Sequence, residues 1–266
     1  MFRGAAVNEL GYEVRGHVAT ITLNRPHRRN AFTLAMLDAW AEAVRQAEAD
    51  RDVRVLVLTG AGDAFCAGVD LDDFKATKRT PLEERELLTH RVHRVALEME
   101  ALSKPAIAAV NGVAVGAGMD MALMCDLRLA STSARFSEGY IRVGLVPGDG
   151  GCYYLPRLIG REQALRMLWT GDFVDAAQAL TMGLVSEVHP DDQIRSAATA
   201  VAEKIASRAP LAVQMIKRAV NGASSMDVRT ALDTNASHQA VVLSTRDSAE
   251  AFSAFKEKRE PRFEGR

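Results

Sequence analysis

The chain has 266 residues, of which 48% are hydrophobic, so it can bury a sizeable core in one large α/β domain or in one domain with a helical extension. The formal net charge is −1, so no overall field favours nucleic acid or a membrane surface as a partner. No apolar run is long enough to span a membrane, and the first residues lack a secretory or transit pattern, so we expect a soluble cytoplasmic protein.

The first part of the chain predicts a hairpin and then a helix. Residues 12–23 alternate between apolar and polar side chains, with a turn at Arg15-Gly16-His17. Apolar residues recur at helical spacing between positions 34 and 44, and Thr33 precedes them as a candidate N-cap. Strand, turn and helix recur in this way through the first two-thirds of the chain.

Two segments repeat the order of a buried strand followed by a glycine turn. Residues 53–58 lead into Thr59-Gly60-Ala61-Gly62-Asp63, and residues 106–110 lead into Asn111-Gly112. The second unit continues through the glycine-rich residues 114–118 into a predicted helix, whose first amides have no partner within the helix. Such amides can hold a developing oxyanion, so the two units together predict one pocket with two amide donors.

The rest of the chain is mainly helical in pattern. Residues 83–102 form a charged helical segment, and from Arg161 onward the pattern is almost wholly helical. Breaks are expected at Gly171, Gly183 to Pro190, Pro210 and Asn221-Gly222. The three cysteines, Cys66, Cys125 and Cys152, have neither metal nor redox spacing, so we interpret them as small core residues in a reducing compartment.

Short motifs run along nearly the whole chain in a fixed order. They read Leu23-Asn24-Arg25-Pro26, Asn30-Ala31, Val57-Leu58-Thr59-Gly60, Phe65-Cys66-Ala67-Gly68-Val69-Asp70, Lys104-Pro105, Ala109-Val110-Asn111-Gly112, Gly144-Leu145-Val146-Pro147, Leu155-Pro156-Arg157, Ala179-Leu180, Gly183-Leu184-Val185, Ala254-Phe255 and Lys258-Arg259. With these motifs the chain resembles the crotonase superfamily of enoyl-CoA hydratases and isomerases. Several ordered motifs at compatible spacings are far more specific than any one of them.

This resemblance implies an α/β fold, a crotonase-like spiral of ββα units followed by a helical C-terminal trimerisation region. We expect the spiral core to occupy residues 1–195 and the helical region residues 196–266. The resemblance also implies an acyl-CoA substrate, with coenzyme A present only as part of that substrate, no separate cofactor and no metal. The assembly it implies is a homotrimer or a dimer of trimers.

The resemblance assigns the two amide donors to the backbone N–H groups of Val69 and Ala117. A thioester enolate bound there carries negative charge on its carbonyl oxygen after a proton is lost or a nucleophile adds. In hydratases of the family two glutamates flank the attacking water, and the matching positions here are Asp120 and Tyr140. Aspartate is one methylene shorter than glutamate, and a tyrosine with an ordinary pKa of about 10 donates a hydrogen bond at neutral pH.

By the same resemblance, Asp149 is the candidate that compensates for this departure. It stands in Val146-Pro147-Gly148-Asp149-Gly150-Gly151, where an ordinary hydratase has a small residue. The alternative is that Asp149 caps a helix beginning near Cys152. Glu138 would share a face with Tyr140 if both were on a strand, and is otherwise a surface carboxylate. For Asp70 and Asp72 turn or cap roles are the preferred interpretation.

Basic groups are expected around the first amide loop and from a neighbouring subunit, because coenzyme A carries phosphates. The CoA-binding candidates are Arg25, His27, Arg28, Lys75, Phe255 and Lys258. The family often has a lysine at the position of Asp72, and Lys75 is a candidate to replace it. Only Phe255 and Lys258 come from a matching motif.

Other site classes find less support. Gly112, Gly116 and Gly118 do not give the dinucleotide fingerprint, and no nucleotide-triphosphate loop is present. His90 and His93 have helical spacing for a metal but no evident third ligand, so a solvated helix face is preferred.

The main hypothesis is therefore an enoyl-CoA hydratase/isomerase-like enzyme, a lyase or isomerase of acyl-CoA metabolism, in which Asp120, Tyr140 and Asp149 handle protons. A carbon-carbon hydrolase of β-diketones is the first alternative, since such enzymes of the superfamily share the Val-Pro-Gly-Asp-Gly loop, with histidine where Tyr140 stands. A non-catalytic acyl-CoA-binding member is the second, favoured by the replacement of a glutamate with Tyr140.

Overall fold

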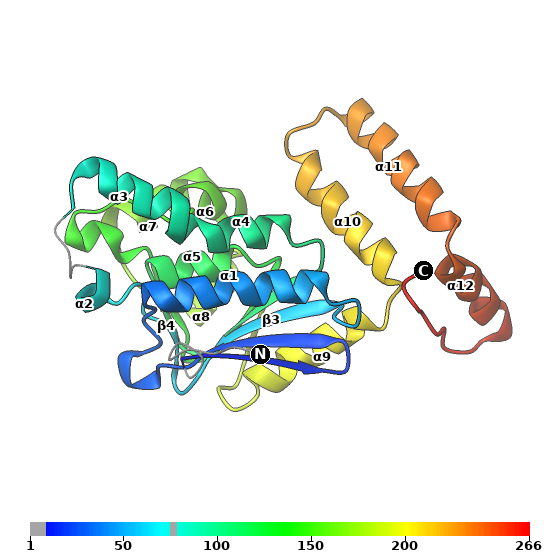
Figure 1. The fold of residues 1–266 in the computed structure, drawn as a ribbon, viewed down its shortest axis with the longest axis horizontal. Helices are drawn as coiled ribbons and strands as arrows, with labels where there is room; N and C mark the ends of the chain where they lie inside the picture. Colours follow the sequence, from blue (N-terminus) through cyan, green and yellow to red (C-terminus); the bar gives the residue numbers. More distant parts are fainter. Residues whose placement is uncertain (1–8, 75–78) are drawn as a thin grey trace.

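Two β-sheets form the centre of the chain, and helices cover them (Figure 1). The computed structural model describes residues 9–74 and 79–266. In the larger sheet the strand order is β1-β2-β3-β5-β7-β10, and every neighbouring pair is parallel except the first. Its strands are β1 (Leu10–Arg15), β2 (Val18–Leu23), β3 (Val55–Gly60), β5 (Ala106–Val110), β7 (Leu127–Ser131) and β10 (Glu187–His189).

The predicted hairpin and first helix are confirmed. β1 and β2 are antiparallel, with Arg15 paired to Val18 across a turn in which Gly16 has a φ of +56°. The first helix, α1 (Leu34–Ala49), begins after Thr33, whose hydroxyl accepts a hydrogen bond from the Met36 amide. The apolar face of α1 is buried because it packs against the helix at residues 93–101 and against strands β1 and β2.

The smaller sheet has the order β4-β6-β8-β9, parallel in its first three strands. Its strands are β4 (Ala64–Cys66), β6 (Val113–Val115), β8 (Arg135–Ser137) and β9 (Val174–Asp175). Along the chain β4, β6 and β8 each follow a strand of the larger sheet, namely β3, β5 and β7. The chain therefore winds through both sheets in successive turns, which confirms the predicted spiral.

Glycines allow successive turns of this spiral to touch through their backbones. A β-carbon on Gly118, in helix α5 (Ala117–Leu123), would lie 2.2 Å from the carbonyl oxygen of Cys66 at the end of β4. A β-carbon on Gly112 would lie 2.0 Å from the carbonyl oxygen of Asp63. Because the colliding atoms belong to the backbone, a side chain at either position displaces one turn of the spiral from the next.

Most helices lie on the chain segments that connect or follow the strands. They are α2 (Leu71–Phe74), α3 (Pro81–Leu87), α4 (His93–Ala101), α6 (Gly151–Ile159), α7 (Arg161–Thr170), α8 (Ala176–Thr181), α9 (Ile194–Ala206), α10 (Pro210–Ala223), α11 (Val228–Leu243) and α12 (Arg246–Glu257), with short η2 (Pro26–Arg28), η3 (Leu88–Val92) and η4 (Gly139–Val143). The predicted helical segment 83–102 is thus divided by η3, which is a turn of π-helix.

The stretch after Arg161 is mainly helical, as expected, and it also contains the strands β9 and β10, which are too short to show alternation. Two details of the sequence-based expectation are wrong. Asn221-Gly222 does not break a helix, because α10 runs to Ala223. Cys66 and Cys125 are buried as expected, but Cys152, the second residue of α6, is exposed.

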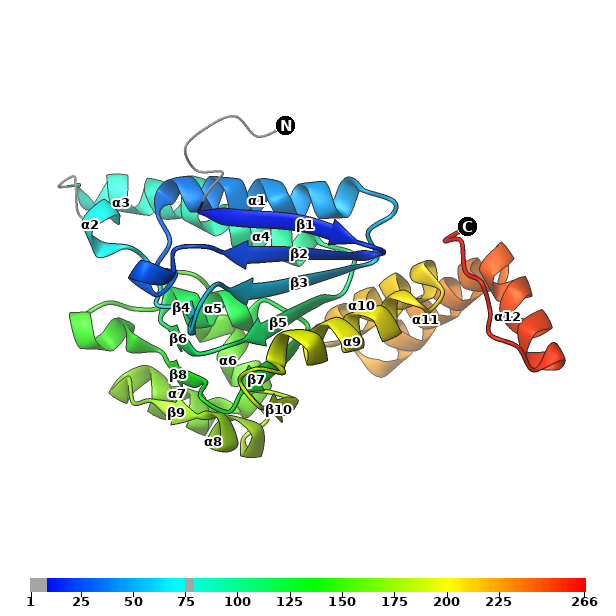
Figure 2. The same cartoon turned by 90° about the horizontal axis from the view of Figure 1, so that it is seen from below.

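The C-terminal helices differ in how they relate to the sheets. α9 lies on the larger sheet, where Ala198 and Ala202 pack into an apolar cluster with Val57 and Ile107. In contrast, α10, α11 and α12 extend away from the sheets in both views (Figures 1 and 2). Within the described residues, no helix is both long and apolar enough to cross a bilayer.

Replacing Gly118 by alanine is expected to destabilise the fold by about 1–3 kcal/mol, because the added methyl group meets the Cys66 carbonyl and neither backbone can retreat freely. Chemical denaturation measures this loss. The matched control is Gly11→Ala, where the new β-carbon would lie 3.5 Å from Thr22 Cβ, an ordinary contact. Equal stabilities of the two variants would contradict the proposed close packing.

Candidate active site

The N-terminal end of α5 brings one predicted amide and one predicted carboxylate together. Ala117 is the first residue of α5 and follows Gly116, which has a φ of +52°. Its N–H group has no acceptor within the helix, since the first amides of a helix precede the first hydrogen-bonded turn. Asp120 lies one turn further along the same helix, and its side chain is fully buried.

The second predicted amide, that of Val69, comes from the loop after β4. Phe32 donates its amide hydrogen to the carbonyl of Gly68 and accepts one at its own carbonyl from Asp70, a pattern that leaves the Val69 N–H outside the pairing. Gly68 has a φ of +94°, and its β-carbon position is 3.7 Å from the Ala117 nitrogen. The loop that carries Val69 therefore packs directly against the start of α5.

Tyr140 connects the two predicted carboxylates. Its hydroxyl lies 2.7 Å from Asp120 Oδ2 and 2.8 Å from Asp149 Oδ2. Its ring packs 3.6 Å from the β-carbon position of Gly116, beside the start of α5. The structure thus brings Asp120, Tyr140 and Asp149 into one hydrogen-bonded chain next to the predicted amides, although they come from three separate segments.

The number of hydrogens in this chain limits its charge. A phenol donates a single hydrogen, so Tyr140 can donate to only one of two ionised carboxylates. The second short contact becomes a hydrogen bond when the other carboxyl is protonated and donates to the phenolic oxygen. The distances therefore fit a cluster that holds a shared proton, and a proton taken up at one carboxylate can be passed through Tyr140 to the other.

Glu138 is a third carboxyl beside Asp120, and both expectations for it are wrong. It is not a surface residue, because it is fully buried, and it does not share a strand face with Tyr140, because β8 ends at Ser137 and Tyr140 lies in η4. A β-carbon on Gly151 would lie 2.4 Å from Asp120 Oδ1 and 2.9 Å from Glu138 Oε1. Both carboxyls therefore press against the first residue of α6.

Burial dominates the electrostatics of the cluster. Burial, with the charge of Asp149, raises the pKa of Asp120 to about 7, although the hydrogen bond from Tyr140 opposes this. Burial and the charge of Asp120 raise the pKa of Glu138 to about 10. Burial also raises the pKa of Asp149 and, with both aspartate charges, that of Tyr140. At neutral pH Glu138 is therefore protonated, and the raised pKa of Asp120 favours uptake of a proton by the cluster.

The loop before α6 holds Asp149 in place without using it as a cap. Gly150 is the N-cap of α6, and that helix has no side-chain cap, so the capping interpretation of Asp149 is wrong. The ring of His93, on α4, lies 2.8 Å from the Gly148 carbonyl oxygen through Nε2. This contact holds the loop from the side of α4.

Within the described residues, no group of three or more His, Cys, Asp or Glu side chains is arranged to hold a metal ion.

Comparison with known proteins gives the context for this geometry. The family model described as enoyl-CoA hydratase/isomerase matches residues 13–266, which is nearly the whole chain. This chain belongs to the enoyl-CoA hydratase/isomerase family. Within the family it is 37% identical to the short-chain-enoyl-CoA hydratase of Clostridium acetobutylicum, over 95% of this chain and 96% of that protein.

Two further similarities cover the chain equally well. The 1,2-epoxyphenylacetyl-CoA isomerase of Escherichia coli is 37% identical over 94% of this chain and 95% of its own length. The crystal structure of an enoyl-CoA hydratase from Bacillus anthracis is 35% identical and has a TM-score of 0.92, with 97% of this chain and 100% of that chain covered. The family thus includes similar proteins named for hydration and for isomerisation.

The candidate CoA-binding residues that the structure describes fall into two groups, one beside the loop after β4 and one on α12. Arg25 is buried and pairs with Asp70, which also pairs with Arg28, so both arginines brace the loop after β4. Asp70 accepts a hydrogen bond from the Asp72 amide, which confirms its turn role. His27 is exposed in η2, and Lys75 lies outside the described residues.

Phe255 and Lys258 belong to the other end of the molecule. Phe255 is 84% exposed on α12, and Lys258 is the C-cap of that helix. Both views separate α12 from the sheets and from the loop after β4 (Figures 1 and 2). Within one chain these two residues therefore cannot reach the acidic cluster.

Sequence reasoning missed two contacts. Glu138 lies between β8 and η4, outside any alternating pattern, so no local signal in the sequence indicates its burial. The contact of His93 with Gly148 joins segments 55 positions apart, and no local pattern announces it.

We expect Asp120→Asn to gain stability relative to the unchanged chain as pH rises from about 4 to about 7. Below this window Asp120 is protonated in both the folded and the unfolded state, so burial carries no ionisation penalty. Within it the unfolded chain releases the proton while the folded chain keeps it, and above pH 7 the penalty is constant. The difference in unfolding free energy should grow by on the order of 4 kcal/mol, measured by denaturation at each pH.

The same substitution at Asp192, which is exposed, serves as the control and should leave the two curves parallel. A pH-independent difference for Asp120→Asn would contradict the raised pKa.

Proposed function

We propose that this protein is an acyl-CoA enzyme of the hydratase/isomerase type that forms a thioester enolate. The observation that carries the proposal is the hydroxyl of Tyr140 between Asp120 and Asp149, at 2.7 and 2.8 Å, beside the start of α5. Acid-base groups are thereby concentrated next to two backbone amides for which the described residues provide no acceptor. This is the combination that removing a proton from the carbon beside a thioester requires.

The amides of Val69 and Ala117 bind the thioester oxygen in this proposal. Backbone donors suit the role because they are fixed before the reaction and need no rearrangement as charge develops. The approach of Gly68 to the Ala117 nitrogen supports a single oxygen site shared by both amides. The enolate form binds more tightly than the neutral thioester, since its oxygen carries more negative charge.

Asp120 and Asp149 exchange protons with the substrate, and Tyr140 links them. A pKa near 7 for Asp120 suits a group that must both take up and return a proton near neutral pH. Isomerisation needs a proton to be removed at one carbon and delivered at another, and a phenol between two carboxylates provides such a path. Hydration needs, in addition, a bound water, for which the same carboxylates are the available bases.

A second candidate is the hydrolytic cleavage of a carbon-carbon bond in a β-diketone. It is favoured by one observation, namely that Asp149 contacts Tyr140 rather than capping α6. A carboxylate in this loop can activate water for attack on a carbonyl group, and the two amides then stabilise the departing enolate.

A non-catalytic acyl-CoA-binding role is disfavoured by the cost of the cluster. Asp120, Glu138 and Asp149 are all buried, and burial of ionisable groups destabilises a fold unless they are neutralised or paired. A protein that only binds gains nothing from this arrangement, whereas perturbed carboxyls in a polar cluster are typical of sites that move protons.

Coenzyme A enters this proposal only as part of the substrate, without a separate cofactor. We propose that Phe255 and Lys258 contact the substrate bound to another copy of the chain, in a trimer or a dimer of trimers. The support is their exposure on α12 at the end remote from the acidic cluster. An extended helical arm can reach a neighbour where it cannot reach its own site.

Replacing Ala117 by proline is expected to lower kcat by about 10²–10³, because it removes one oxyanion donor. The helix should persist, since proline is tolerated at the first position of a helix. Arg161→Pro is the matched control, as Arg161 is also the first residue of a helix and also follows a glycine with positive φ. Equal activities of the two variants would remove the Ala117 amide from the mechanism.

The acid-base assignment is tested by the exchange of substrate α-protons for deuterium. Mass spectrometry measures this exchange on enoyl-CoA and 3-oxoacyl-CoA substrates. We expect Asp120→Asn and Asp149→Asn each to slow exchange by about 10²–10⁴, because each removes a proton-transfer group. Asp172→Asn, at an exposed position outside the cluster, is the control. Unchanged exchange in both cluster variants would overturn the assignment.

The products distinguish the candidate reactions in the same experiment. A gain of the mass of water on enoyl-CoA indicates hydration, and deuterium uptake with a moved double bond indicates isomerisation. Cleavage of a cyclic β-diketone included in the panel supports the second candidate. Acyl-CoA binding without any exchange would contradict enolate formation.

A further inference from the structure

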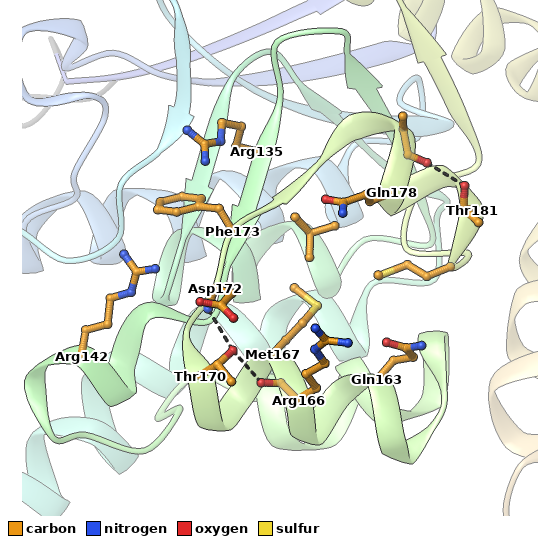
Figure 3. Close-up of a pocket in the computed structure, with 13 residues that line it drawn as sticks. Arg135, Arg142, Gln163, Arg166, Met167, Thr170, Asp172, Phe173, Gln178 and Thr181 are labelled. Carbon is orange, nitrogen blue, oxygen red and sulfur yellow. Dashed lines mark hydrogen bonds between the residues drawn. The ribbon is translucent and has the colours of Figure 1, made fainter.

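A hollow with a basic rim lies on the last turn of the spiral, and the proposed reaction does not use it. Its volume is about 880 Å³, and β8, η4, α7, β9 and α8 contribute its walls (Figure 3). Neither Asp120, Tyr140 nor Asp149 lines it. The hollow is therefore separate from the candidate active site.

Three arginines lie around this hollow without carboxylate partners. Arg135, Arg142 and Arg166 form no ion pair with any described residue, and the acidic residue of the lining is Asp172. The formal charge of the lining is thus +3 from arginine and −1 from aspartate, or +2. Like charges gathered in one concavity repel each other, and an anionic ligand relieves this repulsion.

An aromatic ring holds two of the arginines in position. The guanidinium carbon of Arg135 is 4.6 Å from the centroid of the Phe173 ring, and that of Arg142 is 5.0 Å from it. In Figure 3 the ring lies between the two groups. Contact with a ring face restrains a guanidinium but leaves the N–H donors at its edge free for a bidentate anion.

Part of the lining of the hollow is apolar. Met167 and Val174 are buried there and Met182 is half-buried, while Gln163 and Gln178 add uncharged donors at the rim. An ordinary solvated patch of arginines lacks such a wall. The combination of fixed cationic groups with an apolar wall matches a ligand that has a charged group and a hydrocarbon body.

We propose that this hollow binds a small organic dianion, a dicarboxylate or a phosphate monoester, with an apolar body. Anionic groups of the ligand contact arginines of the rim, which Figure 3 shows at separate points around the hollow, and its hydrocarbon part contacts Met167 and Val174. The site is independent of the proposed acyl-CoA chemistry. The ligand class follows from the +2 charge of the lining and from the apolar wall.

Calorimetric titration of the whole 266-residue chain tests this proposal with two probes, octanedioate and hexyl phosphate. We expect saturable binding of at least one probe. The probe that binds more tightly shows whether the site prefers a dicarboxylate or a phosphate monoester. Arg142→Gln and Arg166→Gln should each raise Kd by about tenfold, because each removes a charged donor pair. Arg161→Gln, on the same helix as Arg166 but outside the lining, should leave Kd unchanged.

Three results would overturn the proposal. The first is no saturable binding of either probe, and the second is equal Kd values in the three variants. The third combines two observations, namely that no probe binds and that the double variant Arg142→Gln and Arg166→Gln has a different assembly state by light scattering. This result would show that the hollow is a contact between copies of the chain. Malonate, which lacks the hydrocarbon body, should bind at least tenfold more weakly than octanedioate if the apolar wall contributes.

Discussion

The arrangement of this protein depends on how three buried carboxyls are neutralised. Asp120, Glu138 and Asp149 come from α5, from the residue after β8 and from the loop before α6, and within the described residues none of them pairs with lysine or arginine. The hydroxyl of Tyr140 takes the place of such cations for Asp120 and Asp149, and burial raises the pKa of Glu138 so that this carboxyl stays protonated. The ionisation of each group therefore depends on the others, and the cluster titrates as a unit.

Close packing around the cluster offsets the destabilisation that comes from burying three carboxyls. Gly68 and Gly118 let the loop after β4 and the start of α5 approach to backbone contact, and Gly151 leaves room for two carboxyls against α6. A structure with such contacts holds its polar groups within narrow limits, which is what fixed amide donors need. The ion pairs of Arg25 and Arg28 with Asp70 secure the other side of the same loop.

Much of the fold could be predicted because its signals are local. The hairpin of residues 12–23, the capping by Thr33 and the two units of strand and glycine turn all follow from periodicity and turn chemistry. Strands β9 and β10 escaped because two or three residues carry no measurable alternation. The meeting of Asp120, Tyr140 and Asp149 was expected only through family resemblance, since their contact is tertiary.

The surroundings of individual charged side chains were harder to infer from the sequence than the secondary structure. Whether Glu138 is a surface or a core residue depends on tertiary packing, because it lies between the end of β8 at Ser137 and the start of η4 at Gly139, outside any strand alternation. The roles of Arg25 and Arg28 depended on Asp70, which lies more than 40 positions away. Charge and sequence motif identified these residues, but only packing identifies their partners.

The loop around Asp149 also has an evolutionary consequence. Its backbone path is set by Gly150, with a φ of +114°, and by the tight contact at Gly151, whereas Asp149 itself adopts no left-handed conformation. A point mutation in the Asp149 codon can therefore replace the one carboxylate that Tyr140 contacts in this loop without rerouting the chain. Mutation can therefore change which proton-transfer groups the site contains without changing the fold. Proteins that descend from this one can acquire new reactions while the architecture is kept.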